Sequence, residues 1–401
     1  MGEGTPRRVL LTERQHRLPA RLLGHAPALD GLRGLAVALI VVFHFAGHAE
    51  LAGHGVLRGA PAGLDVFFAL SGFLITALLL DERRVTGRVA LSAFYGRRAC
   101  RLLPALVAML VVWTLLLLAF HDQGWMGSTP AGDGSGRAVP VVPALKDVVA
   151  SVLYAANWDV ISGGTAAPLQ HLWSLAVEEQ FYIVWPFALL LLLLVHHRLR
   201  HGFLVLAVAL SCTTSLLLWQ GGEGKDRIYF GSDTRAASLL IGALGALLWH
   251  RRRSSGQVLG RYAAPRAWLG VAVFLVVLVE AHDGAWRYVG MPATVALCVT
   301  QVMPYVVDQP RVLMARWLSS GWLVWLGQRS YGLYLWHYLW ATWTHGLPLA
   351  AALALGLAGS LACTVLSWRF VERPALRWWR GREPQQVRER PVRVLEPRLA
   401  A

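Results

Sequence analysis

Apolar residues are grouped along the chain into runs separated by short polar segments rich in arginine, glycine and proline. A helix needs about 20 apolar residues to cross a hydrocarbon core of about 30 Å, and many of the runs approach that length. The pattern predicts an all-α, polytopic membrane protein with ten spanning helices. They are expected at 32–48, 62–80, 102–120, 172–195, 203–219, 234–249, 267–282, 287–307, 330–346 and 348–368.

An eleventh, weaker apolar run at 145–162 is interrupted by Lys146, Asp147, Asn157 and Asp159. If it does not span, most of the basic residues fall on one side of the membrane, which the positive-inside rule assigns to the cytoplasm. We therefore expect a re-entrant or interfacial segment at 145–162, and both chain termini inside the cell.

Composition agrees with a membrane protein, since 56% of the residues are apolar and only 15% are charged. A soluble domain carries about 25% charged residues. The formal net charge of +15 does not indicate a nucleic-acid surface, because the arginines lie in short clusters between the apolar runs. The four cysteines are far apart, so we expect neither a disulfide nor a metal site. The pattern predicts a multi-pass protein of the plasma membrane.

The first predicted span carries Arg33 and His44. Eleven residues of helix make three turns plus about 20°, so the two side chains share a face and are about 16 Å apart along the axis. An ionisable group inside a span is a candidate functional residue. The alternative is that Arg33 is a cytoplasmic anchor and His44 a packed helix histidine.

A second polar group opens the span that begins near His171. In a helix His171, Ser174 and Glu178 share one face, with Trp173 between them and Glu179 further round. Two adjacent carboxylates are hard to explain by packing, which favours a functional carboxylate, although one of them could simply interact with the helix dipole.

Two further spans contain isolated polar residues. Asp65 opens the second span, and Ser71 lies deeper in it, beside Gly72, which could simply allow close helix packing. In the ninth span Tyr334 and His337 lie on one stripe, where His337 is either a second functional histidine or part of aromatic packing.

The first cytoplasmic loop ends with Arg98 and Arg101, one helical turn apart and just before Pro104. Basic residues beside a membrane span usually interact with anionic lipid headgroups. Guanidinium groups with this spacing also suit phosphates, so a coenzyme with a pyrophosphate could bind there.

Several of these segments closely resemble the membrane-bound acyltransferase family 3. The similar segments are Leu29–Gly34 with His44, Asp65–Thr76, Phe94–Pro104, His171–Pro186, Ser330–His337 and Arg369–Pro374. The resemblance extends over 29–374, which we take as the membrane domain, with tails at 1–28 and 375–401.

The resemblance implies an O-acyltransferase that uses acyl-CoA, most simply acetyl-CoA, as co-substrate and holds no permanent cofactor. The family's Arg-x10-His motif matches Arg33 and His44, its Arg-x-x-Arg motif matches Arg98 and Arg101, and its membrane glutamate matches Glu178. We expect His44 to act as general base and Glu178 to orient it.

In this interpretation Arg33, Arg98 and Arg101 would hold the coenzyme phosphates, and Ser71 or a backbone group near it would serve the oxyanion. Asp65, His171, Trp173, Ser174, Glu179, Tyr334 and His337 are expected to support the site.

The sequence shows neither the soluble esterase-like domain nor the long extracytoplasmic loop of some family members. In this respect it is more similar to the enzymes that acylate a macrolide-like metabolite in antibiotic biosynthesis, with a sugar or cell-surface glycan as the alternative acceptor. A proton-coupled transporter or flippase remains the alternative function, because it would use the same intramembrane charges.

Overall fold

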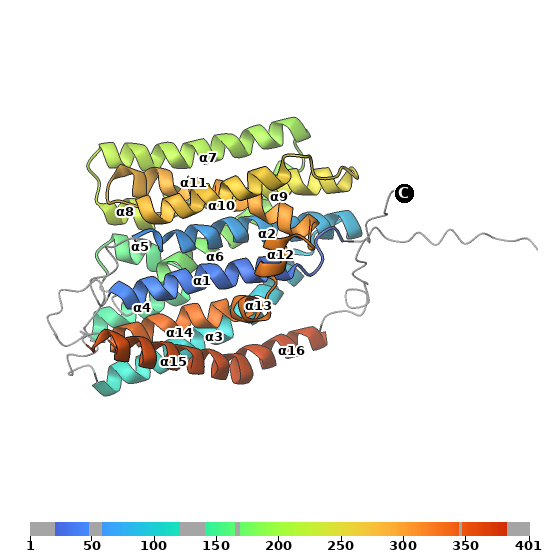
Figure 1. Ribbon diagram of the computed structural model, residues 1–401. Coiled ribbons are helices and arrows are strands. Elements are labelled where there is room, and N and C mark those ends of the chain that lie inside the picture. Colours follow the sequence, from blue (N-terminus) through green and yellow to red (C-terminus); the bar gives the residue numbers. More distant parts are fainter. Residues whose placement is uncertain (1–20, 48–57, 121–140, 165–168, 345–346, 383–401) are drawn as a thin grey trace, which may run out of the picture.

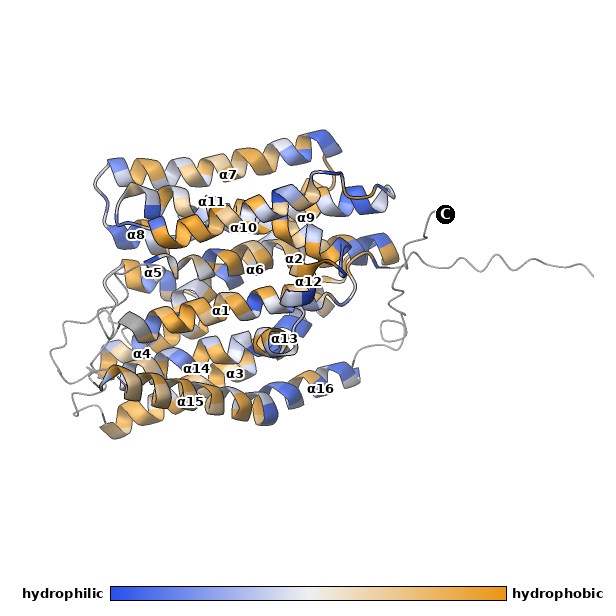
Figure 2. Ribbon diagram, in the orientation of Figure 1, coloured by the Kyte–Doolittle hydropathy of each residue, from blue (hydrophilic) through white to orange (hydrophobic). Residues whose placement is uncertain are grey.

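A computed structural model describes residues 21–47, 58–120, 141–164, 169–344 and 347–382, and all regular elements within these ranges are helices. Most long helices lie side by side in one bundle (Figure 1). Their apolar residues occupy the middle of the bundle, and polar residues gather towards its two ends (Figure 2). The prediction of an all-α polytopic membrane protein is confirmed.

Eight helical segments of the described chain are long and apolar enough to cross a membrane. They are α1 (Pro27–Gly47), α2 (Ala62–Thr86), α3 (Leu91–Phe120), α6 (Leu172–Leu192), α7 (His197–Gln220), α10 (Ala263–Glu280), the π-helical turn η5 (Trp286–Gly290) with α11 (Met291–Asp308), and α15 (Leu349–Ser367) with η6 (Trp368–Glu372) and α16 (Arg373–Arg382).

The other two predicted spans are also helices but do not meet this criterion. They are α9 (Ser232–Ser254), which begins with charged residues and ends in Arg251–Arg253, and α14 (Ser330–Trp343), which has only 14 residues. Both helices are packed inside the bundle. Neighbouring helices therefore bury the charged start of α9, and they surround α14, which is too short to span alone.

The weak run at 145–162 forms two short helices instead of one span. These are α4 (Val141–Val152) and α5 (Ala156–Ile161), separated by a turn at Tyr154. This agrees with a re-entrant or interfacial segment. Helix α5 packs against α8 (Lys225–Phe230) at one end of the bundle, called here the α8 end.

The opposite end, called here the arginine-rich end, carries Arg251–Arg253 and α16. Its predicted loop 308–329 contains α12 (Leu313–Leu318) and α13 (Gly321–Gln328), and α13 packs along the first half of α1. Helix α16 extends beyond the expected domain boundary at 374 and packs on α3. The tail segments 1–20 and 383–401 lie outside the described residues.

Glycines set the closest helix contacts. A Cβ on Gly72 would come within 1.9 Å of the Leu239 carbonyl oxygen, and one on Gly242 within 2.1 Å of the Ala69 carbonyl oxygen. Helices α2 and α9 therefore pack backbone to backbone, which confirms the packing interpretation of Gly72.

Candidate functional site

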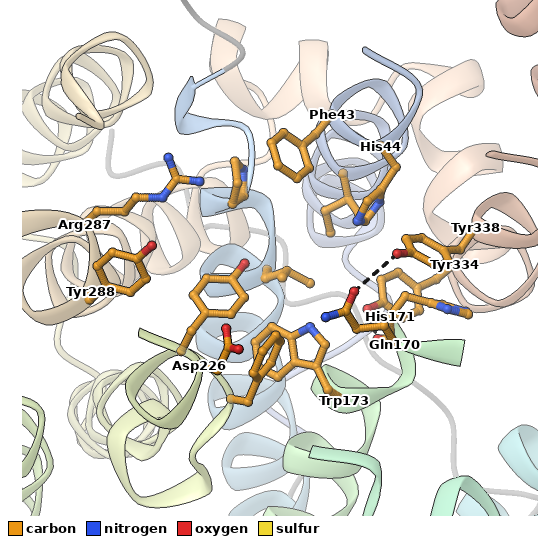
Figure 3. A pocket seen from close by; sticks show the side chains of 15 residues that line it. Phe43, His44, Gln170, His171, Trp173, Asp226, Arg287, Tyr288, Tyr334 and Tyr338 are labelled. Atoms are coloured by element: carbon orange, nitrogen blue, oxygen red, sulfur yellow. Dashed lines mark hydrogen bonds between the residues drawn. The ribbon is translucent and has the colours of Figure 1, made fainter. Parts of the chain in front are cut away.

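A cavity of about 370 Å³ opens between α1, α6, α8, η5 and α14 at the α8 end (Figure 3). This volume lies at the lower end of the range for small-molecule sites. Two of the predicted histidines, His44 and His171, line it together with Trp173 and Tyr334. The structure thus brings residues from three distant parts of the chain to one cavity.

His44 and His337 form a hydrogen-bonded pair in this region, with 3.0 Å between His44 Nδ1 and His337 Nε2. His337 Nδ1 lies 2.8 Å from the Tyr334 carbonyl oxygen and 3.1 Å from that of Leu333, so it must carry the proton and donate it. In neutral His337, Nε2 is then an acceptor and His44 Nδ1 donates to it. We infer that His44 Nε2 carries the lone pair, which is the state that a general base requires.

His171 occupies the N-cap position of α6 and is held by aromatic contacts. Its ring stacks on Tyr338 with centroids 4.8 Å apart and meets His337 edge-on at 5.8 Å. The Tyr334 hydroxyl donates to the His171 carbonyl oxygen at 2.5 Å and is 2.6 Å from the Ser174 hydroxyl. Ser174 and Tyr334 therefore fix the start of α6 against α14.

Aromatic rings form the opposite wall of the cavity. Trp173 packs against Tyr229 and Phe230 of α8, with centroid distances of 5.0 Å and 5.1 Å. Asp226 and Arg287 line the same cavity, and Arg287 is carried by the π-helical turn η5 (Figure 3). The cavity thus offers flat apolar faces with a few polar groups.

A buried ion pair supports this wall from behind. Asp65 of α2 is 1% exposed and Arg235 of α9 is 3% exposed, with 3.2 Å between Arg235 Nη1 and Asp65 Oδ1. Arg235 Nε also donates to the Tyr229 carbonyl oxygen at 2.8 Å, and its guanidinium lies over the Tyr229 ring at 4.3 Å. Asp65 therefore supports the cavity wall through Arg235, a residue that sequence reasoning missed.

The described contacts of Glu178 differ from the expectation that it orients His44. Its carboxylate accepts hydrogen bonds from the Ser71 and Tyr182 hydroxyls, and it does not line the cavity. The physical reason is depth, since seven residues of helix place Glu178 about 10 Å further along α6 than His171. His44 Nδ1 instead donates its orienting hydrogen bond to His337 Nε2, and the Ser71 hydroxyl donates to Glu178 and not into the cavity.

Glu179 is the more buried carboxylate, and it pairs with Arg98. Arg98 Nη2 donates to Glu179 Oε1 at 3.0 Å, and the guanidinium lies 3.3 Å from the centroid of the Tyr182 ring. Arg98 and Arg101 were expected one helical turn apart at the end of the first cytoplasmic loop, and both lie inside α3, which begins at Leu91. A guanidinium held in this way has less capacity left for phosphate.

Arg33 and Arg101 differ from Arg98 in this respect. The structure gives no ion pair or side-chain hydrogen bond for either in the described part of the chain, although the positive charges of Arg33, Arg98 and Arg101 are close enough to interact. Arg101 is exposed and Arg33 partly exposed. Neighbouring guanidinium groups repel each other, and the carboxylates of Asp30, Glu179 and Glu372 offset part of the positive charge at Arg101.

Sequence reasoning missed the remaining polar and tyrosine residues of the cavity, which are Gln170, Asp226, Tyr229, Arg287, Tyr288 and Tyr338. Tyr338 lies one residue after His337, and Gln170 one before His171, so their position beside predicted residues was an available signal. Tyr229 and Arg287 had no comparable signal, because they come from short connecting elements.

The described residues contain no group of three His, Cys, Asp or Glu side chains arranged to hold a metal ion. All four cysteines are free. The polar groups that line the cavity are histidine, tyrosine, tryptophan, amide, carboxylate and guanidinium groups.

Together, the helical bundle, the His44–His337 pair beside its cavity and the arginine cluster define a polytopic membrane protein with a polar site among its helices. Comparison with known families is more specific, because the profile described as "Acyltransferase domain" matches residues 27–369. The chain belongs to this family, as the resemblance of its motifs indicated.

Curated relatives are O-acetyltransferases by name. The chain is 31% identical over 370 residues to the peptidoglycan O-acetyltransferase OatA of Listeria monocytogenes, covering 87% of this chain and 56% of that protein. It is 30% identical over 331 residues to the O-acetyltransferase OatA of Staphylococcus aureus strain NCTC 8325, covering 78% of this chain and 50% of that protein. The chain thus spans little more than half the length of these relatives, and no solved structure matches it.

Proposed function

We propose that this protein is an O-acyltransferase of the plasma membrane that moves an acyl group, most simply acetyl, from acyl-CoA to a hydroxyl of an acceptor in the cavity. The observation that carries the proposal is the His44–His337 pair, in which the hydrogen-bond pattern leaves His44 Nε2 as the basic nitrogen at the cavity. Family membership and the names of the relatives support the same reaction class.

In the proposed reaction His44 Nε2 accepts the proton of the acceptor hydroxyl while the hydroxyl oxygen attacks the thioester carbonyl carbon. His337 Nε2 accepts the hydrogen bond of His44 Nδ1 and stabilises the imidazolium. His171 and the Gln170 amide line the same cavity and are the candidate N–H donors for the oxyanion, in place of Ser71. The C–S bond then breaks, and the proton on His44 passes to the thiolate of CoA.

The donor phosphates are proposed to bind at Arg33 and Arg101, with Arg98 beside them. Helix α1 separates Arg33 from His44 by about 16 Å. An extended pantetheine arm can cover such a distance, so the nucleotide can remain at the arginine-rich end while its thioester reaches the cavity. We place the arginine-rich end in the cytoplasm and the α8 end outside, because basic residues are retained on the cytoplasmic side of membrane proteins.

The acceptor is proposed to present a hydroxyl on a sugar-sized ring. The aromatic wall suits the apolar face of such a ring, and Asp226 and Arg287 suit its hydroxyls. A macrolide-like metabolite and a cell-surface glycan can both supply this group. Because the Listeria relative is named a peptidoglycan O-acetyltransferase, a glycan acceptor should be tested alongside the macrolide-like one.

The test uses the purified chain in nanodiscs with acetyl-CoA labelled in the acetyl group and either a glycosylated macrolide or a peptidoglycan fragment. We expect labelled acceptor and free CoA in equal amounts, and loss of both with His44→Ala at unchanged thermal stability. Label carried across proteoliposomes without release of CoA would instead establish the transporter.

A further inference from the structure

A second cavity lies along the first half of α1, whereas the cavity beside His44 lies along its second half. Its volume is about 500 Å³, and it lies between α1, α2, α10, α11 and α12. The described residues that line it include no charged, hydroxyl or amide side chain. A cavity of this kind does not hold water, because a bound water needs polar partners. In a membrane protein its natural occupant is hydrocarbon.

The cavity has the form of a groove between α10 and α1. Helix α10 packs on α11, and α1 packs on α2, α11 and α12, so that α2 and α11 form the floor. At α12 the lining residues Leu313 and Trp317 are 74% and 50% exposed, whereas Val66 and Leu278 are 3% and 4% exposed. The backbone at Gly59 covers Leu278, since a Cβ on Gly59 would come within 2.3 Å of Leu278 Cα. The groove is therefore open at α12 and covered at Leu278.

The groove runs parallel to the long helices, from the arginine-rich end inward. Helix α10 starts at that end, since it follows Arg251–Arg253, and α11 ends there, since Asp308 pairs with two of these arginines. Helix α12 also lies near this end (Figure 1). On α10 the lining residues extend from Trp268 to Leu278, which is about 15 Å along the helix axis. This length is about half of a hydrocarbon core of about 30 Å, which is the depth of one leaflet.

The entrance carries the residues expected at a membrane surface. Trp268 and Trp317 line it, and each is 50% exposed. Tryptophan is enriched at the level of the lipid headgroups. Arg311 and Arg316 flank the lining residues of α12 in the sequence, and both are exposed. Asp308, the acidic residue nearest to them in the sequence, already pairs with arginines of α9. The entrance is therefore positively charged and suits an anionic headgroup.

We propose that this groove binds one acyl chain of an anionic phospholipid from the cytoplasmic leaflet, with the lipid phosphate at the entrance near Arg311 and Arg316. Lipid tails are as apolar as the groove, so close packing and the charge at the headgroup hold the lipid in place. The bound chain fills the space between α10 and α1, the helix that carries His44. The inference is independent of acyl transfer, and only the choice of leaflet follows from the orientation given under the proposed function.

The deciding variant is Val271→Trp, which fills the groove, because Val271 lines it. Val276→Trp is the matched control on the same helix, since Val276 is 59% exposed and does not line the groove. The phospholipid that stays bound after purification in mild detergent is counted by native mass spectrometry and a phosphorus assay. We expect one phospholipid per chain in the wild type and in Val276→Trp, and at least about tenfold less in Val271→Trp. Equal retention in the two variants overturns the proposal.

A second measurement uses the unchanged chain, so it does not depend on how a variant folds. Wild-type protein in nanodiscs is illuminated with phosphatidylglycerol that carries a diazirine in one acyl chain, and the cross-linked peptides are mapped. We expect cross-links at lining residues of α10, α11 and α12, among them Val271 and Cys298. Cross-links confined to exposed positions outside the groove overturn the proposal, as does a retained molecule without phosphate, such as a fatty acid or detergent.

The headgroup is tested with the double variant Arg311→Gln/Arg316→Gln. Competition with unlabelled lipids should show a preference for phosphatidylglycerol over phosphatidylcholine in the wild type. This preference should fall by about fivefold for each arginine removed, while cross-linking in the groove persists. Arg373→Gln/Arg377→Gln, on α16, which packs on α3, is the control and should keep the preference. An unchanged preference in the first pair, or an equal loss in both pairs, overturns the assignment of the headgroup to Arg311 and Arg316.

Discussion

The buried pair Asp65–Arg235 allows a quantitative prediction for stability. Both side chains are almost fully buried, and the pair joins the two helices that pack most closely, α2 and α9. Asp65→Asn keeps the shape of the side chain but leaves the Arg235 charge without a compensating carboxylate. Removing one partner of a buried pair costs about 3–5 kcal/mol.

In a domain of this size 1 kcal/mol corresponds to about 2 °C, so the melting temperature of Asp65→Asn should fall by roughly 6–10 °C. The measurement is tryptophan fluorescence during heating in detergent, with the wild type alongside. Arg235→Met should cost at least as much, because Arg235 also donates to the Tyr229 carbonyl oxygen.

The double variant Asp65→Leu/Arg235→Met separates charge from packing. Replacing both charges by apolar side chains of similar size is close to neutral for a buried pair, so most of the lost stability should return. Acceptor binding should not return, because the guanidinium over Tyr229 supports the cavity wall. Additive losses in the double variant, or an unchanged melting temperature in Asp65→Asn, would refute the reasoning.

Three further predictions follow from single contacts. His337→Leu should lower kcat about 10²- to 10³-fold, because it removes the acceptor that orients His44. His337→Gln should retain more activity, because its amide oxygen can still accept the hydrogen bond. Equal rates of the two variants in a CoA-release assay would contradict the tautomer assignment. Arg101→Met should raise the KM for acetyl-CoA at least tenfold, and Arg101→Lys less; the two variants should be indistinguishable if phosphate does not bind there. Gly72→Ala should lower the melting temperature, because its methyl group would meet the α9 backbone. Gly260→Ala is the control and should leave the melting temperature unchanged, because its methyl group would meet nothing within 4 Å. Similar melting temperatures for the two variants would argue against the close helix contact.

Much of the fold was predictable from the chain, because membrane helices must satisfy their backbone hydrogen bonds within each segment and expose apolar residues to lipid. All ten predicted spans are helices, and the interrupted run at 145–162 forms two short helices, neither of which is a candidate span. The charged start of α9 and the shortness of α14 show the limit of this reasoning, since hydropathy cannot tell a lipid-facing helix from one surrounded by protein.

Three of the predicted residues come together in the structure, but the contacts among the predicted residues could not be foreseen from the sequence. His44, His171 and His337 do come together, yet the expected partner of His44 was Glu178, which lies too deep along α6. A sequence gives the spacing along one helix but not the relative height of two helices. Arg235 was missed for the same reason, although a buried Asp65 implies a cationic partner somewhere in the bundle.

Helix α1 is clamped near its start, where Gly31 and Gly34 pack against the backbone of α12 and α13, and it carries His44 near its other end. One residue inserted between Gly34 and His44 would turn the imidazole by about 100° away from His337 while leaving the composition of the helix almost unchanged. Natural variants of this segment should therefore differ freely in which apolar residues they use but almost never in how many, and an insertion or deletion here is the change that evolution can least readily accept.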